Sequence, residues 1–131
     1  MDEQLKCLAG KYMKDVGDMC HTLFEGFGVQ NKFELGRVIR ERRNGEFWVN
    51  KKKYVARLHG RGCEVFDGKT YLDWDFDGEG FGINPMMLWR YIEQTAPELY
   101  EFFSLTRINE EFSKAVSNGE MIVKDDLYYL T

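Results

Sequence analysis

The chain has 131 residues, of which 44% are hydrophobic, 15% aromatic and 31% charged. This composition is typical of one globular domain with a single core, and it excludes a disordered chain. The formal net charge of −4 argues against a general attraction to nucleic acid or to an anionic membrane. No apolar run approaches the length of a membrane-spanning helix, and residues 1–15 lack the blocks of a secretion signal.

The three cysteines are scattered along the chain at Cys7, Cys20 and Cys63. An odd number of cysteines without regular spacing argues against a disulfide framework and predicts reduced thiols. We therefore expect a cytoplasmic protein with a single domain over residues 1–131, which folds alone or as a small homo-oligomer.

A long amphipathic helix is predicted over residues 3–25, because apolar side chains recur every third or fourth position. These positions are Leu5, Leu8, Tyr12, Val16, Met19, Leu23 and Phe27. Gly26 and Gly28 are expected to end the helix. A shorter helix should follow Asn31, whose spacing to Glu34 matches a capping box, and should end near residues 44–45.

From Glu46 the apolar period changes to two, which predicts a β-meander of three or four antiparallel strands over residues 46–76. A two-residue turn at Asp67–Gly68 would place Phe66 opposite Lys69. Alternation then divides the side chains between two faces. The inner face should carry Cys63, Val65, Leu72, Trp74, Phe76, Tyr54, Ala56 and Leu58, and the open face Glu64, Phe66, Lys69, Tyr71, Asp73, Asp75, Val55, Arg57 and His59.

The C-terminal part of the chain is predicted to be mainly helical. Asn84 and Pro85 match the cap and first residue of a helix to about Thr95. A short helix should follow Pro97, then another that ends at residues 118–119, and then a hairpin that turns at residues 125–126. The expected fold is α+β: an antiparallel meander packed against N-terminal and C-terminal helices, with a short C-terminal hairpin.

One acidic run has the spacing of the first half of a calcium loop, with carboxylates at Asp73, Asp75 and Asp77 followed by Gly78. The bidentate Glu that should complete such a loop is replaced by Asn84. In a strand, residues two apart point the same way, so the spacing also arises without a metal. These three aspartates are nevertheless the candidate ligands of a metal-binding module or a metal-dependent hydrolase.

His59 and Cys63 are close in sequence, which suggests a metal site or a Cys–His nucleophile. Their predicted positions on opposite faces of the sheet argue against both. We expect His59 to form a hydrogen bond or ion pair with Asp73 or Asp75. The chain also lacks a phosphate-binding loop and a dinucleotide fingerprint, so we expect no catalytic residue and no cofactor.

The basic segment from Arg40 to Lys53 also contains Phe47 and Trp48. Cationic and aromatic side chains together are typical of a surface that binds single-stranded nucleic acid. The acidity of the whole chain argues against this role. Lysines that protect a sheet edge from strand addition explain the same residues.

The segment from residue 58 to 92 resembles a bacterial domain family of unknown function. The matching motifs are His59-Gly60, Gly62-Cys63, Asp73-Trp74-Asp75-Phe76, Gly80-Phe81 and Leu88-Trp89. The sequence departs from the family pattern at Asp77-Gly78, where the family has glycine directly after Phe76. The resemblance implies no assigned activity. In general character, small acidic domains of this kind are similar to immunity proteins that neutralise bacterial toxins.

Our leading functional expectation is a non-enzymatic protein-interaction module, of the immunity or regulatory type. Six acidic residues against Lys69 alone between residues 62 and 84 favour a protein partner with a basic surface. The candidate partner-binding residues are His59, Phe66, Tyr71, Asp73, Asp75, Asp77 and Glu79. A metal-dependent function through Asp73, Asp75 and Asp77 and nucleic-acid binding through Arg40–Lys53 are the alternatives.

Overall fold

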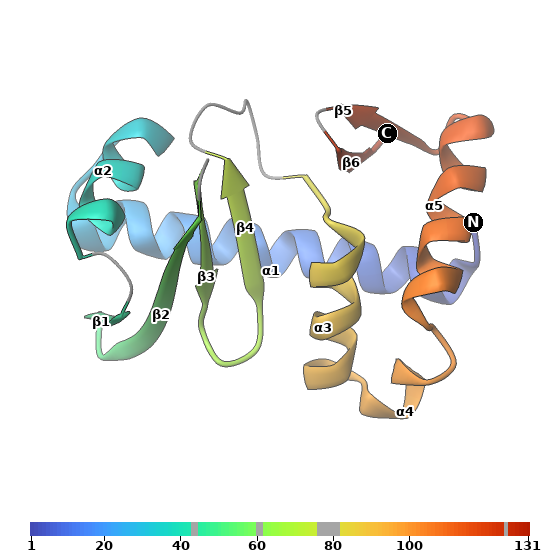
Figure 1. Cartoon of the computed structure of the whole chain (residues 1–131), viewed down its shortest axis with the longest axis horizontal. Helices are drawn as coiled ribbons and strands as arrows, with labels where there is room; N and C mark the ends of the chain where they lie inside the picture. Colours follow the sequence, from blue (N-terminus) through green and yellow to red (C-terminus); the bar gives the residue numbers. More distant parts are fainter. Residues whose placement is uncertain (43–44, 60–61, 76–81, 125) are drawn as a thin grey trace. The chain divides into compact units, whose positions relative to one another are not determined.

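The computed structural model describes residues 1–42, 45–59, 62–75, 82–124 and 126–131 (Figure 1). The chain forms two compact units, one made of Met1–Lys14 with Phe81–Thr131 and the other of Asp15–Gly80. Helices, a four-stranded antiparallel sheet and a two-stranded hairpin confirm the α+β class. The expectation of one domain over residues 1–131 stays a prediction.

Helix α1 (Glu3–Phe27) contributes its first part to one unit and its second part to the other. The predicted apolar stripe is confirmed, since Leu5, Tyr12, Val16, Met19 and Leu23 are all buried. The helix ends at Gly28, where φ is +65° and the Val29 N–H donates to the Phe24 carbonyl at 3.0 Å, as in a Schellman motif.

Gly26 does not end α1, contrary to our expectation, because it lies inside the helix. A Cβ atom at Gly26 would overlap with Cγ1 of Val49. The absent side chain therefore allows close approach between α1 and the sheet, which sequence periodicity could not reveal.

Helix α2 (Lys32–Arg42) begins with the predicted cap. The Glu34 N–H donates to Asn31 Oδ1 at 3.0 Å. The Glu34 carboxylate accepts from the Gln30 N–H at 2.8 Å, one residue before the position expected in a capping box. The cap satisfies amide groups that the first turn of the helix leaves without partners.

The sheet has the order β1-β2-β3-β4, with strands Gly45–Val49, Lys52–His59, Gly62–Phe66 and Tyr71–Asp75. Residues 15–27 of α1 run behind it (Figure 1). Side chains of the inner face are buried, namely Phe47, Val49, Tyr54, Ala56, Cys63, Val65 and Leu72. Alternating burial of this kind confirms the predicted inner face for Tyr54, Ala56, Cys63, Val65 and Leu72. The predictions for Trp74 and Phe76 lie outside the described residues.

The predicted turn at Asp67–Gly68 is wrong in length. Phe66 pairs with Tyr71 rather than with Lys69, so the loop holds four residues. Asp67 Oδ1 accepts from the N–H groups of Lys69 at 3.0 Å and Thr70 at 2.7 Å, and this local bonding competes with a tighter turn. Because the register moves by two residues, the described side chains of β3 and β4 keep their predicted faces.

The two-residue turn of the sheet lies instead between β1 and β2. Val49 pairs with Lys52, and both turn residues have positive φ, +50° at Asn50 and +66° at Lys51. These angles are those of a type I′ turn, whose twist matches that of the flanking strands.

The other unit contains helices α3 (Pro85–Thr95), α4 (Pro97–Tyr100) and α5 (Leu105–Ser117) and the hairpin of β5 (Met121–Lys124) and β6 (Leu127–Leu130). As predicted, Asn84 caps α3, with its Oδ1 accepting from the Met86 N–H at 2.9 Å. The core includes an edge-to-face contact between Tyr12 and Tyr91, whose centroids are 5.2 Å apart. Within the described ranges, no helix has the length and apolarity needed to cross a bilayer.

Candidate functional site

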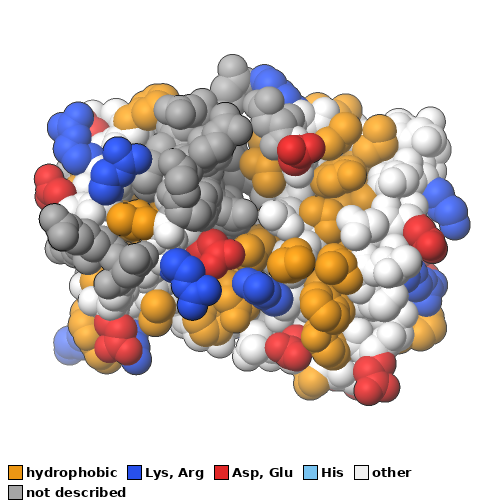
Figure 2. All heavy atoms as spheres, viewed as in Figure 1, with side chains coloured by type: hydrophobic (Ala, Val, Ile, Leu, Met, Phe, Trp, Pro, Cys, Tyr) orange, Lys and Arg blue, Asp and Glu red, His pale blue; other side chains and the backbone are white. Residues whose placement is uncertain are grey.

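The open face of the sheet carries a row of apolar side chains across three strands. Val55, Phe66 and Tyr71 are consecutive partners in the strand register. The rings of Phe66 and Tyr71 stack with their centroids 4.2 Å apart. Val55 is 39% exposed, and Trp48 on β1 is 65% exposed. Figure 2 shows apolar side chains among charged ones on this side of the sheet. We call Trp48, Val55, Phe66 and Tyr71 the aromatic face.

Charged residues border the aromatic face. Arg57 and Glu64 are register partners in the neighbouring row. On the other side, Lys53 Nζ lies 2.8 Å from Glu46 Oε1. An apolar centre with a charged rim is the usual anatomy of a protein-binding surface.

Of the residues predicted to bind a partner, the structure brings Phe66 and Tyr71 into contact. The side chains of His59, Asp73 and Asp75, and all of Asp77 and Glu79, lie outside the described residues. The acidic loop and the aspartate metal site therefore stay predictions. Elsewhere, in the part of the chain that the structure describes, no group of three or more His, Cys, Asp or Glu side chains could hold a metal.

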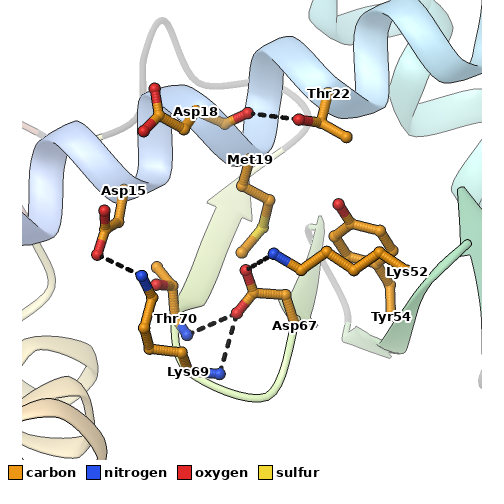
Figure 3. Close-up of a pocket in the computed structure, with 9 residues that line it drawn as sticks. All are labelled: Asp15, Asp18, Met19, Thr22, Lys52, Tyr54, Asp67, Lys69 and Thr70. Carbon is orange, nitrogen blue, oxygen red and sulfur yellow. Dashed lines mark hydrogen bonds and ion pairs between the residues drawn. The ribbon is translucent and has the colours of Figure 1, made fainter. Parts of the chain in front are cut away.

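A polar pocket of about 160 Å³ lies on the inner side of the sheet, where sequence reasoning predicted no site. Helix α1, strand β2 and the loop between β3 and β4 supply its walls (Figure 3). The lining residues are Asp15, Asp18, Met19, Thr22, Lys52, Tyr54, Asp67, Lys69 and Thr70.

Two ion pairs cross or border the pocket. Lys69 Nζ lies 3.0 Å from Asp15 Oδ2, and Lys52 Nζ lies 3.0 Å from Asp67 Oδ2. Lys69 was expected on the open face, but its ammonium group reaches α1 behind the sheet because the residue belongs to the wider loop. The Asp67 side chain is only 5% exposed, and its other oxygen holds the loop amides.

Two side chains of the pocket have pKa values above their usual ones. The hydrogen bond to Asp67 raises the pKa of Lys52 above its usual value, against the opposing effect of burial. Burial raises the pKa of the Tyr54 hydroxyl, and the Lys52 charge partly opposes this. Lys52 therefore stays cationic and Tyr54 stays a neutral hydrogen-bond donor at neutral pH.

Thr70 is the one buried polar residue of the described core, with none of its surface exposed. Its backbone N–H donates to Asp67 and its carbonyl accepts from the Asp67 N–H at 3.3 Å. Its Oγ1 atom has no hydrogen-bond partner among the described residues. A buried hydroxyl is ordinarily hydrogen-bonded to the protein or to an ordered water.

The lining of the pocket contains neither His nor Cys, and the Thr22 hydroxyl donates to the Asp18 carbonyl at 3.0 Å. The side chains that line it are mainly charged or hydrogen-bonding groups, which can recognise a polar ligand.

Two weak sequence signals pointed toward the pocket. Asp67 precedes Thr70 by three residues, a spacing that permits the observed side-chain bond to the loop amides. Asp15, Asp18 and Thr22 follow one another at helical spacing on α1. Neither signal identifies the partner element, so the pocket could not be assembled from sequence.

Comparison with known proteins identifies the family of the chain. The sequence model of a family described as "Domain of unknown function (DUF6896)" matches residues 6–130. No curated protein and no solved structure matches the chain.

Proposed function

The chain belongs to the DUF6896 family, a domain of unknown function, and from its own geometry we propose that it is a non-enzymatic protein-interaction module. Its partner is a protein with a basic surface, which docks on the aromatic face. The observation that carries this proposal is the stacked Phe66–Tyr71 pair in one row with the exposed Val55. Immunity-type or regulatory binding is the biological role that fits such a module.

Aromatic residues at the centre of a patch are the usual hot spots of protein interfaces. Stacking holds the Phe66 and Tyr71 rings in place before binding, so a partner loses little side-chain entropy on contact. Trp48 adds a large exposed aromatic surface on the edge strand. A rigid aromatic centre therefore favours protein recognition.

Charge favours a basic partner. The chain has a net charge of −4, and residues 62–84 contain six acidic residues against one lysine. Opposite charge speeds association and selects among partners more than it raises affinity. The acidic residues Asp75, Asp77 and Glu79 would contribute to this attraction.

The basic segment offers less support for nucleic-acid binding. Lys52 and Lys53 form ion pairs with Asp67 and Glu46, at 3.0 Å and 2.8 Å. A lysine already paired within the fold releases fewer counterions when it meets a phosphate.

The thiols support a reducing, cytoplasmic setting. Cys20 and Cys63 are buried, Cys7 is exposed, and none of the three forms a disulfide. Burial raises the pKa of Cys20 to about 12, so that thiol stays protonated and unreactive.

The experiment is affinity purification of the tagged chain from its own cells, followed by titration calorimetry with the purified partner. We expect a protein with a basic isoelectric point. Tyr71→Ala should weaken its binding by about 30-fold, as hot-spot truncations do. Val55→Lys should also weaken it, because the new cation meets a basic surface.

The matched control is Ile122→Ala, since Ile122 is an exposed apolar residue of the other unit, at 56%. It should leave affinity unchanged, and all variants should keep their melting temperatures within a few degrees. An acidic partner, or equal binding by Tyr71→Ala, would contradict the proposal. So would self-association through the aromatic face, seen by sedimentation and lost in Val55→Lys.

A further inference from the structure

We propose that the basic partner adds an extended strand of its own to the outer edge of β1, in antiparallel direction and beside the aromatic face. This inference rests on the proposed function, because it assigns the binding mode of the same partner. Three observations carry it: the direction of the backbone groups of β1, the lack of protective residues along this strand, and the chemistry of Glu46 and Trp48.

The backbone groups of Glu46 and Trp48 point away from the sheet. Val49 and Lys52 close the two-residue turn between β1 and β2, so they form a hydrogen-bonded pair. Such pairs alternate with non-hydrogen-bonded ones along an antiparallel ladder, which puts Trp48 and Glu46 at non-hydrogen-bonded positions. Their N–H and C=O groups therefore face outward, where no backbone group of the described residues bonds to them. Because β1 is the outermost strand of the sheet (Figure 1), these groups can pair with an added strand.

The edge of β1 lacks the usual protection against strand addition. Edge strands of soluble proteins are commonly protected by lysine, by proline or by a β-bulge. Strand β1 contains neither lysine nor proline, and its register with β2 runs without an inserted residue. Lys52 and Lys53, which were candidates for this protection, belong to β2 and pair with Asp67 and Glu46. The edge therefore keeps its capacity for pairing.

The side chains beside this edge favour a basic strand. Glu46 and Trp48 project from β1 on the open face, with the Glu46 side chain 59% exposed and Trp48 65% exposed. Lys53 Nζ contacts Oε1 of Glu46 at 2.8 Å and leaves Oε2 without a partner among the described residues. A carboxylate attracts a cation, and the indole ring is the best aromatic group for a cation–π contact. Basic residues of the added strand can therefore meet both side chains.

Antiparallel pairing defines which residues of the partner make these contacts. Residues opposite Glu46 and Trp48 would direct their N–H groups to β1 and their side chains to the open face. Two basic residues separated by one residue thus match both positions. Main-chain hydrogen bonds then give affinity and alternate side chains give specificity, as in other cases of strand addition. The added strand also extends the aromatic face beyond Trp48.

The test uses the peptide acetyl-Thr-Arg-Val-Lys-Val-Thr-amide, titrated into the full chain by calorimetry. N-methylation of its Arg and Lys removes the amide hydrogens that face β1, whereas N-methylation of its two valines removes hydrogens that face away. We expect the first change to weaken binding by about tenfold or more and the second to leave it nearly unchanged. Replacing Arg and Lys by Glu should also weaken binding. Equal losses for the two methylated peptides would overturn the proposal, as would no binding of the unmodified peptide at millimolar concentration.

Glu46→Pro tests the edge from the side of the protein. Proline removes an outward N–H and no hydrogen bond of the β1–β2 ladder. The matched control Glu46→Ala loses the carboxylate but keeps the N–H. Relative to this control, Glu46→Pro should bind the peptide about tenfold more weakly. In the wild type, the peptide should slow hydrogen exchange of the Trp48 amide.

The purified partner separates this inference from the proposed function. If Tyr71→Ala weakens binding of the partner while Glu46→Pro binds it as well as Glu46→Ala, the aromatic face is the docking surface and the added strand is wrong. Loss of partner binding in Glu46→Pro supports the added strand. Sedimentation of the free chain is the last check, since a dimer that Glu46→Pro dissociates would show that a second copy occupies the edge and would overturn the proposal.

Discussion

The two hairpins of the sheet are attached to α1 in different ways. In the β1–β2 hairpin, Val49 packs against Gly26, and the rings of Phe47 and Phe27 lie 5.7 Å apart. In the β3–β4 hairpin, Lys69 pairs with Asp15 of α1 at 3.0 Å. Both hairpins bury apolar side chains on the inner face, including Val65 and Leu72 of the second hairpin. The first attachment is marked by steric fit at Gly26, and the second adds an ion pair.

The ion pair between Lys69 and Asp15 accounts for the polar pocket beside the second hairpin. Apolar side chains fill the space between elements at near-crystalline density. Ion pairs act at defined distances and directions, and they need polar neighbours rather than filled volume. The β3–β4 loop can thus be held against α1 with a polar space left beside it.

Asp67→Ala should produce the largest effect, because it removes the group that shapes the β3–β4 hairpin. We expect a loss of about 2–4 kcal/mol in the free energy of unfolding, measured by urea denaturation. Most of this loss comes from the two loop amides, since Lys52 is 52% exposed and can return to water. Asp67→Asn keeps one acceptor oxygen and should lose less. A loss below about 0.5 kcal/mol for Asp67→Ala would show that the loop does not need its carboxylate.

Gly26→Ala tests the β1–β2 hairpin. The added methyl group overlaps with Val49, and such overpacking costs about 1–3 kcal/mol. Gly17→Ala is the matched control on the same helix, because a Cβ there has no neighbour within 4 Å. It should stabilise the protein by up to about 1 kcal/mol. Urea denaturation measures the free energy of unfolding of both variants. If Gly26→Ala and Gly17→Ala changed it in the same direction, the close approach of α1 and β1 would be contradicted.

Lys51→Gly tests the strain in the turn between β1 and β2, and Gly68→Ala tests the loop between β3 and β4. Lys51 has φ of +66°, a conformation that costs most residues about 1–2 kcal/mol and that glycine adopts freely. Glycine also loses more backbone entropy on folding, which offsets part of this gain. We therefore expect the free energy of unfolding, measured by thermal unfolding, to rise by about 0.5–1 kcal/mol. Gly68→Ala, at φ of +98°, should change stability in the opposite direction.

Alkaline pH should lower the free energy of unfolding by a smaller amount than these substitutions, through the Lys52–Asp67 pair. The folded pKa of Lys52 is raised, mainly by the hydrogen bond to Asp67. The stability that this shift contributes is fully present below the unfolded pKa of about 10.4. It is lost as pH rises through the folded pKa. Tyr54, whose pKa burial raises, acts in the same direction.

The measurement is the free energy of unfolding from about pH 9 to 12, the range in which lysine and tyrosine titrate. The wild type should lose more stability over this range than Asp67→Asn, which lacks the main cause of the Lys52 shift. Cys20, with its pKa of about 12, contributes equally to both proteins and cancels in the difference. If the free energies of unfolding of the wild type and Asp67→Asn fell in parallel with pH, the role of the Lys52–Asp67 pair would be contradicted.

Local patterns predicted most of the fold. The period of apolar residues located α1 and the strands, and Asn84 with Pro85 located the start of α3. These signals are local because helix and strand side chains repeat at fixed intervals. The predicted faces survived the wrong turn at Asp67, since a shift of two residues preserves the alternation.

The candidate sites were only partly predictable. Phe66 and Tyr71 were placed on the open face from alternation alone, and their stacking required the true register. The pocket joins Asp15 to Lys69, residues that are far apart in the chain. Nothing in the sequence near either residue identifies the other as its partner.

Sequence by itself thus determined the class of the fold, the strand faces and the acidic character of the chain, because these depend on composition and on short-range periodicity. Tertiary structure decided the length of the β3–β4 turn, the role of Gly26 and the existence of the pocket. The physical reason is that a side-chain hydrogen bond, a steric fit and an ion pair depend on which atoms meet in space, and that meeting is set by the packing of α1 on the sheet.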